Sequence, residues 1–238
     1  PVSTGGEEMD IQGFQKLTLL DYPERVACTV FLAGCNFRCP FCHNASLVTH
    51  VDTSRNIPEE RIFSFLEKRA GILDGVCITG GEPLLALDLE EFIKRIRSMG
   101  YLVKLDTNGS NVNRLEYFLR KGLVDYVAMD VKNSPAKYGM TAGIEDYSTQ
   151  NVRESVKLLM KGRVQYEFRT TVVREFHKRE DFEAIGEWLR GAEKYYLQSF
   201  ADSGDLIRPG LHGYTREIME QALAIVRKYV PNAQLRGT

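Results

Sequence analysis

The sequence contains no long hydrophobic run and no excess of charge of one sign. No apolar stretch approaches the roughly 20 residues that are needed to cross a bilayer, and no signal-peptide core opens the chain. The 31 basic and 32 acidic residues leave a net charge of -1, which gives no reason to expect general nucleic-acid binding. We therefore predict a cytoplasmic protein with no nucleic-acid partner and no membrane partner.

The chain also lacks an internal repeat and a low-complexity linker that would divide it. Its 238 residues, 43% hydrophobic and 26% charged, are enough for one globular domain with a sizeable core. Residues 1–8 are polar and glycine-containing and have no initiator methionine. We expect them to be a leader or a cloning remnant, with Met9 as a candidate natural start.

Cysteine is scarce, but it is unevenly distributed. Three of the five cysteines, Cys35, Cys39 and Cys42, lie within eight residues. An odd number of cysteines with three so close together favours a metal site in a reducing compartment over a disulfide scaffold. Three thiolates leave a fourth ligand position open, which is typical of a working metal centre. The alternative is a structural zinc site completed by His43 or His50.

Apolar strands and amphipathic helices alternate along the chain. We expect strands at residues 25–32, 75–79, 101–105, 125–129, 165–173 and 194–200. We expect helices near residues 58–69, 88–99, 112–121, 151–160, 179–189 and 215–229, and a short strand or hairpin cover at residues 9–22. This alternation predicts an α/β fold with one parallel sheet lined by outer helices. We favour a single-domain, open (β/α)6 partial TIM barrel over a flat doubly wound sheet.

Polar residues follow these strands at their carboxyl ends, where parallel α/β folds place their active sites. The cysteine loop follows the first strand, Gly80-Gly81-Glu82-Pro83 the second, and Asp106-Thr107-Asn108-Gly109 the third. Asp130 and Lys132 follow the fourth strand, Arg169 lies within the fifth, and Gln198 lies near the end of the sixth. Their common position predicts one site at one rim of the sheet.

Taken together, these motifs resemble those of the radical S-adenosylmethionine (SAM) superfamily. The resemblance rests on Cys-x3-Cys-x2-Cys with an aromatic residue before the last cysteine, Gly-Gly-Glu-Pro, Asp-Thr-Asn-Gly and Asp-x-Lys. Within the superfamily, the chain resembles the glycyl-radical-enzyme activating proteins. Residues 13–23 (GFQKLTLLDYP) and the string Cys-Pro-Phe-Cys-His-Asn are most similar to the short activating proteins of anaerobic ribonucleoside-triphosphate reductase. The resemblance implies a radical SAM domain at residues 9–238.

The resemblance implies one 4Fe–4S cluster on Cys35, Cys39 and Cys42, with SAM bound to the fourth iron. An electron from the cluster would cleave SAM to methionine and a 5′-deoxyadenosyl radical, which would remove a Gly Cα hydrogen from a large glycyl-radical enzyme. A flavodoxin- or ferredoxin-type protein is the implied electron donor. No protein acid or base is assigned to this reaction.

Further SAM contacts are implied at the strand ends. Gly80 and Gly81 would let the backbone approach the ligand, and Glu82 would accept from the methionine amino group, although this motif alone could be a simple turn. Phe41 would pack near the adenine or shield the cluster from water. Gln198 stands where many relatives have a histidine.

The charged residues leave two interpretations open. The resemblance places Asp106 and Asp130 beside the methionine moiety, in some relatives bridged by a monovalent cation, and Thr107 could add an oxygen ligand. Lys132 offers a cation for the methionine carboxylate, or a structural ion pair with an aspartate. Arg169 would bind a carboxylate or form a buried salt bridge.

Two other functions remain open at this point. A radical SAM enzyme of this kind could modify another glycyl-radical enzyme, a peptide or a small molecule. A zinc-stapled binding module without catalysis is the alternative outside radical chemistry. Cys28 and Cys77 lie in apolar strands, and we expect them to be core thiols.

Overall fold

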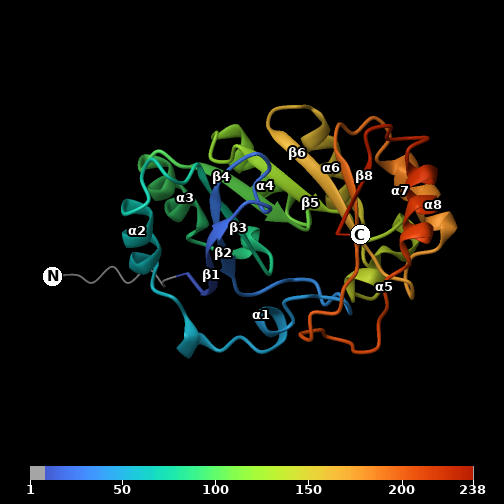
Figure 1. The fold of residues 1–238 in the computed structure, drawn as a ribbon, viewed down its shortest axis with the longest axis horizontal. Helices are drawn as coiled ribbons and strands as arrows, with labels where there is room; N and C mark the ends of the chain where they lie inside the picture. The colour runs from blue at the N-terminus through green and yellow to red at the C-terminus, as the bar shows by residue number, and fades with distance from the viewer. Residues whose placement is uncertain (1–8, 238) are drawn as a thin grey trace.

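A single eight-stranded sheet forms the centre of the computed structural model, which describes residues 9–237 (Figure 1). The predictions for residues 1–8 lie outside the described residues. The strands are β1 (Ile11–Thr18), β2 (Ala27–Leu32), β3 (Gly75–Gly80), β4 (Leu102–Thr107), β5 (Tyr126–Asp130), β6 (Gln165–Val172), β7 (Tyr195–Ser199) and β8 (Gln234–Arg236). They follow one another in chain order.

Only β1 runs against its neighbour. It pairs antiparallel with β2, and each later pair of neighbours is parallel. Strands β1 and β8 are the two edges of the sheet, so the barrel is open. The predicted α/β partial barrel is therefore confirmed, and β2 to β7 are its six predicted strands.

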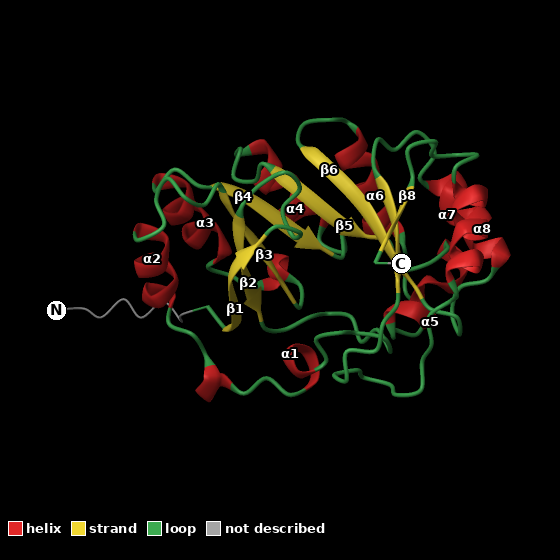
Figure 2. Ribbon diagram, in the orientation of Figure 1, coloured by secondary structure: helices red, strands yellow, loops and turns green. Residues whose placement is uncertain are grey.

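The helices lie outside the curved sheet (Figure 2). They are α1 (Ser46–Thr49), α2 (Glu59–Glu67), α3 (Leu89–Ser98), α4 (Val112–Arg120), α5 (Tyr138–Ala142), α6 (Gln150–Met160), α7 (Arg179–Trp188) and α8 (Arg216–Val226). Helix α3 shows why they form: Phe92, Ile93 and Ile96 make one buried face, while acidic residues in its first turn and arginines in its last turn complement the helix dipole. None of the described helices is long and apolar enough to cross a membrane.

Strand β8 and the short helices α1 and α5 were not predicted. Strand β8 has only three residues, Gln-Leu-Arg, and shows no alternation of apolar and polar residues that could be recognised. It forms because it pairs with β7 after α8 has brought the chain back to the sheet. Helix α5 has five residues and packs beside the cysteine loop, so both β8 and α5 depend on tertiary contacts.

The inside of the barrel is polar, whereas the space between sheet and helices is apolar. Lys104 and Glu167 point inward from the middle of their strands and are each only 1% exposed. Cys28 and Cys77 are fully buried free thiols. The charged interior thus runs from the middle of the sheet to its carboxyl rim, where the candidate site lies.

Candidate active site

The cysteine loop follows β2 and is held across the carboxyl ends of the strands by backbone hydrogen bonds. The Arg38 amide donates to the Ala142 carbonyl at 2.9 Å, and the Arg208 amide donates to the Pro40 carbonyl at 2.9 Å. Gly143 ends α5 with a φ of +70°, and a Cβ atom there would lie 2.0 Å from the Arg38 carbonyl oxygen. Only glycine fits this contact, so α5 fixes the position of the loop.

Aromatic side chains hold the loop from within. Phe37 is buried and packs edge-on against Tyr147, with ring centroids 5.2 Å apart. Phe41 is buried and packs against Phe176, with ring centroids 5.8 Å apart. These contacts anchor the residues between the cysteines, which lets the three thiols face inward.

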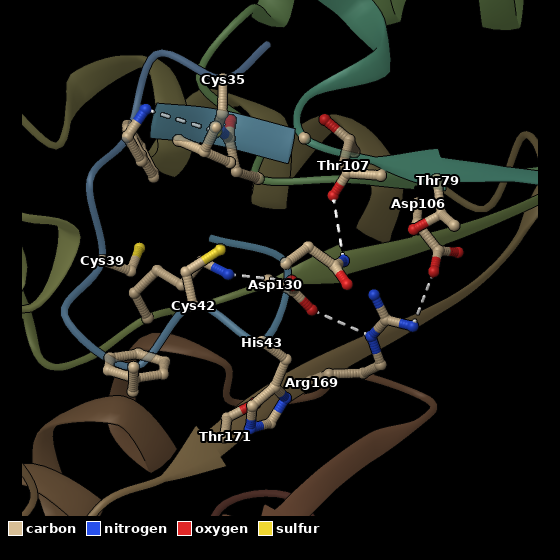
Figure 3. Close-up of a pocket in the computed structure, with 18 of the residues that line it drawn as sticks. Cys35, Cys39, Cys42, His43, Thr79, Asp106, Thr107, Asp130, Arg169 and Thr171 are labelled. Atoms are coloured by element: carbon tan, nitrogen blue, oxygen red, sulfur yellow. Dashed lines mark hydrogen bonds and ion pairs between the residues drawn. The ribbon is translucent and has the colours of Figure 1, made fainter. Parts of the chain in front are cut away.

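The loop and the strand ends enclose a cavity of about 240 Å³ (Figure 3). Every site residue predicted from the sequence lines it, except Glu82. The cysteines lie on one side, and Asp106, Asp130 and Arg169 lie on the other (Figure 3). The rim of the parallel strands thus brings together residues that are more than 160 positions apart in the chain.

Cys39 is the most deeply buried of the three cysteines, and Cys35 and Cys42 are half-buried. Cys39 is 7% exposed, and burial raises its pKa to about 12. Burial also raises the pKa of Cys35, whose sulfur accepts hydrogen bonds from the Phe37 amide at 3.3 Å and from the Asn108 side chain at 3.8 Å. Thiolates at this depth need a positive partner, because desolvation disfavours an unpaired charge. A metal centre would supply that partner.

The donor arrangement fits a cluster better than a single ion. Among residues 9–237, no three Cys, His, Asp or Glu side chains lie close enough together to hold one metal ion. A 4Fe–4S cluster takes each thiolate on a different iron and therefore needs separated sulfurs around a cavity, as Cys35, Cys39 and Cys42 provide. His43, one of the two candidates for a fourth zinc ligand, stacks on Phe200 with the ring centroids 5.4 Å apart.

The two glycines of the Gly-Gly-Glu-Pro motif serve backbone packing. Gly80 has a φ of +119°, and a Cβ atom there would lie 2.2 Å from the Leu32 carbonyl oxygen. A Cβ atom on Gly81 would lie 1.9 Å from the Gly34 carbonyl oxygen. Both glycines also line the cavity, but what requires glycine here is the close approach of β3 to the start of the cysteine loop.

Glu82 lies behind the cavity wall and is 1% exposed. Its carboxylate accepts from the Thr107 hydroxyl at 2.7 Å and from the backbone amides of Asn108 at 2.6 Å and Leu84 at 3.1 Å. Burial raises its pKa to about 7 against the opposing effect of these donors. Glu82 thus ties the end of β3 to the end of β4. Its predicted contact with an ammonium group stays a prediction.

A network of ion pairs forms the opposite wall. Arg169 donates to Asp106 at 3.0 Å and to Asp130 at 2.9 Å, and Lys132 donates to Asp130 at 2.9 Å (Figure 3). Burial opposes the charge of each aspartate, but the charge of Arg169 outweighs it and lowers the pKa of both carboxyl groups. The pKa of Lys132 is raised, mainly because Asp130 outweighs desolvation. All of these groups are therefore charged at neutral pH.

Sequence reasoning missed several residues of the site. Thr79, Asn108 and Thr171 line the cavity, and Lys104 pairs with Asp106 from inside the barrel. Lys104 and Asp106 are two positions apart on one strand, so strand alternation places both on the inner face. The alternation of side chains along the strand could therefore have identified Lys104 from the sequence. Thr171 faces Gln198 across β6 and β7, which only the register of the sheet reveals.

Comparisons with known proteins identify the chain. Residues 29–189 match the Radical SAM superfamily. The chain is 30% identical over 232 residues to a provisionally named glycyl-radical enzyme activating enzyme of Methanocaldococcus jannaschii, covering 95% of each chain. It is 31% identical over 120 residues to the pyruvate formate-lyase-activating enzyme of Listeria monocytogenes, covering 46% of this chain and 48% of that protein.

Among solved structures, a domain of pyruvate-formate lyase-activating enzyme from Bacteroides vulgatus superposes with a TM-score of 0.56 at 17% identity. The match covers 68% of this chain and 99% of that domain, and at this identity it shows a shared fold. The sequence motifs, the cavity that they line and the match over residues 29–189 lead to one conclusion. The chain belongs to the radical SAM superfamily, and it is an enzyme of that superfamily.

Proposed function

We propose that this protein is an activating enzyme for a glycyl-radical enzyme, with anaerobic ribonucleotide reductase as the leading partner. The observation that carries the proposal is the single cavity shared by three cysteines and the charged strand ends. The likeness to the Methanocaldococcus jannaschii protein over 95% of both chains supports the activating role. The choice of partner rests on the resemblance of residues 13–23 and of the cysteine loop.

In this proposal Cys35, Cys39 and Cys42 hold the one 4Fe–4S cluster. When bound, the cluster supplies the electron that cleaves SAM to methionine and a 5′-deoxyadenosyl radical. The residues proposed to contact SAM are Phe41, Gly80, Gly81, Asp106, Thr107, Asp130, Lys132, Arg169 and Gln198. Glu82 supports this set through Thr107 and Asn108. The resemblance also implied a monovalent cation between Asp106 and Asp130, which the ion pairs of these two carboxylates disfavour.

The chain's own residues give the cavity the character that an aminocarboxylate needs. Lys132 and Arg169 bring positive charge to the side opposite the cysteines, where a carboxylate can be held. Phe41 and Phe37 give the cavity apolar walls that exclude water from the cluster side. No protein acid or base is required, because the hydrogen passes from glycine to the deoxyadenosyl carbon.

We further propose a cytoplasmic protein served by a flavodoxin- or ferredoxin-type electron donor, with no nucleic-acid or membrane partner. The five free cysteines fit a reducing compartment, and the net charge of -1 offers no attraction to nucleic acid. Residues 9–238 are proposed to act as one radical SAM domain.

The test is anaerobic incubation of the reduced, cluster-loaded protein with SAM and a candidate ribonucleotide reductase. A doublet in the electron paramagnetic resonance spectrum of the partner is expected. Release of 5′-deoxyadenosine without a radical on any candidate glycyl partner would contradict the activating role and favour a peptide or small-molecule substrate.

A cysteine pair provides the matched control for the cluster ligands. Cys39→Ala should abolish SAM cleavage, because it removes one of three iron ligands. Cys28→Ala removes another buried thiol, one that does not line the cavity, and should leave cleavage intact. Cleavage by the Cys39→Ala protein at the wild-type rate would refute the ligand assignment.

A further inference from the structure

Each of the four carboxylate oxygens opposite the cysteines has its own basic partner. Asp106 pairs with Lys104 through Oδ1 and with Arg169 Nη1 through Oδ2, the latter at 3.0 Å. Asp130 pairs with Arg169 Nε through Oδ1 at 2.9 Å and with Lys132 Nζ through Oδ2 at 2.9 Å. A further cation would therefore have to compete with a basic side chain at every oxygen of the two carboxylates.

Arg169 is the centre of this arrangement because it alone bridges both aspartates. Arg169 and Asp130 are neighbours in register on β6 and β5, while Asp106 reaches the same guanidinium from β4. The planar guanidinium presents several N–H donors in a fixed fork, so one side chain can bind two carboxylates at once. The side chain is 14% exposed, which limits its freedom to leave the pair.

The charges in the network do not cancel. Three basic side chains face two carboxylates, which leaves one net positive charge on this wall of the cavity. Glu167, the next acidic residue inward, is already paired with Arg236 at 2.8 Å and does not offset this charge. An added Na⁺ or K⁺ would meet a positive field and would share each carboxylate oxygen with a basic side chain, whereas a carboxylate would be attracted.

These observations disagree with the expected cation bridge between Asp106 and Asp130. We propose that Arg169 is a built-in counter-ion in the position of such a cation, so that SAM binding requires neither Na⁺ nor K⁺. The excess positive charge then serves the carboxylate of the bound amino-acid portion. This inference rests on the proposed function as far as SAM is concerned, but the counter-ion role itself does not.

The first experiment measures SAM binding to the cluster-loaded wild-type protein by anaerobic calorimetry. Chloride salts of Na⁺, K⁺ and tetramethylammonium are compared at one ionic strength, since tetramethylammonium is too large to enter a carboxylate bridge. The dissociation constant should agree within twofold in all three salts. A fivefold or greater tightening by Na⁺ or K⁺ overturns the proposal.

The second experiment needs neither cluster nor SAM. The unfolding midpoint of the cluster-free protein is measured in the same salts and in millimolar guanidinium chloride. The wild-type midpoint should be the same in the three salts, whereas Arg169→Ala should be stabilised by Na⁺, K⁺ or guanidinium relative to tetramethylammonium. Arg190→Ala, which breaks an exposed ion pair with Glu187, is the matched control and should show no such preference.

The two experiments separate the possible failures. Absence of any SAM binding would contradict the proposed function and leave the unfolding data to decide the counter-ion role. If Arg169→Ala responds to cations no more than wild type does, the counter-ion role is refuted. Arg169→Lys keeps the charge but not the fork, so it should fall between the two proteins. Should Arg169→Ala not fold, the Arg169→Lys variant and the wild-type binding data still decide the question.

Discussion

Glu82 belongs to a recognisable motif, yet it lies behind the cavity wall and acts by holding residues that line the cavity. Its carboxylate receives three hydrogen bonds and joins the loops that follow β3 and β4. Through Asn108 this connection continues to the Cys35 sulfur. At Gly81 the residue type is set by backbone packing, because a Cβ atom there would meet the Gly34 carbonyl oxygen. At both positions, the residue type is required by the contact between two loops that the cavity depends on.

The buried carboxyl group of Glu82 should make stability depend on pH. Its pKa rises from 4.5 to about 7 on folding, so between these values the folded state holds a proton that the unfolded state has lost. The unfolding free energy therefore falls as pH rises through this range, by up to about 3 kcal/mol. Urea unfolding at pH 5 and pH 8 should show a larger loss for wild type than for Glu82→Gln. Equal losses would contradict this assignment.

At the scale of elements, the short edge strand β8 supplies a charged partner to the polar interior of the barrel. Arg236 extends from β8 to Glu167 on β6, with distances of 2.8 and 3.1 Å between its guanidinium nitrogens and the two carboxylate oxygens. The Tyr126 hydroxyl donates to the same carboxylate at 3.0 Å. Since Glu167 is 1% exposed, its charge depends on these partners.

Arg236→Ala should therefore destabilise the fold by about 2 kcal/mol or more, because it leaves a buried carboxylate without its cation. Arg216→Ala is the matched control: it breaks a pair with Glu220 at 3.0 Å in which both side chains are more than half exposed. The control should change the unfolding free energy by less than about 0.5 kcal/mol. Urea unfolding of both variants tests the difference, and equal effects would argue against a role for β8 in stabilising the charged interior of the barrel.

At the scale of the whole molecule, the site is made of two halves that come from different layers. The cysteine loop is held by α5 and by the segment around Arg208, and the charged half is held by the sheet. SAM bound between them would connect both halves. The free energy of binding would then appear in the stability of the entire domain.

SAM should stabilise only the cluster-loaded protein. At a SAM concentration a hundredfold above its dissociation constant, the unfolding free energy should rise by about 2.7 kcal/mol. After the cluster has been removed with a chelator, the rise should fall to a small fraction of this value, because the iron to which SAM would bind is lost. Anaerobic unfolding with and without chelator measures the difference. An undiminished rise in the cluster-free protein would show that SAM binding does not depend on the cluster.

The sequence by itself determined the α/β alternation, the position of the cysteine loop after β2, and most of the residues that line the cavity. These are local properties: apolar strands, amphipathic helices and polar residues at strand ends. Only the tertiary structure decided the pairing of Arg169 with both aspartates, the pairing of Glu167 with Arg236, and the existence of β8. Each of these depends on the register between strands far apart in the chain, because charges find their partners only after the sheet has curved around them.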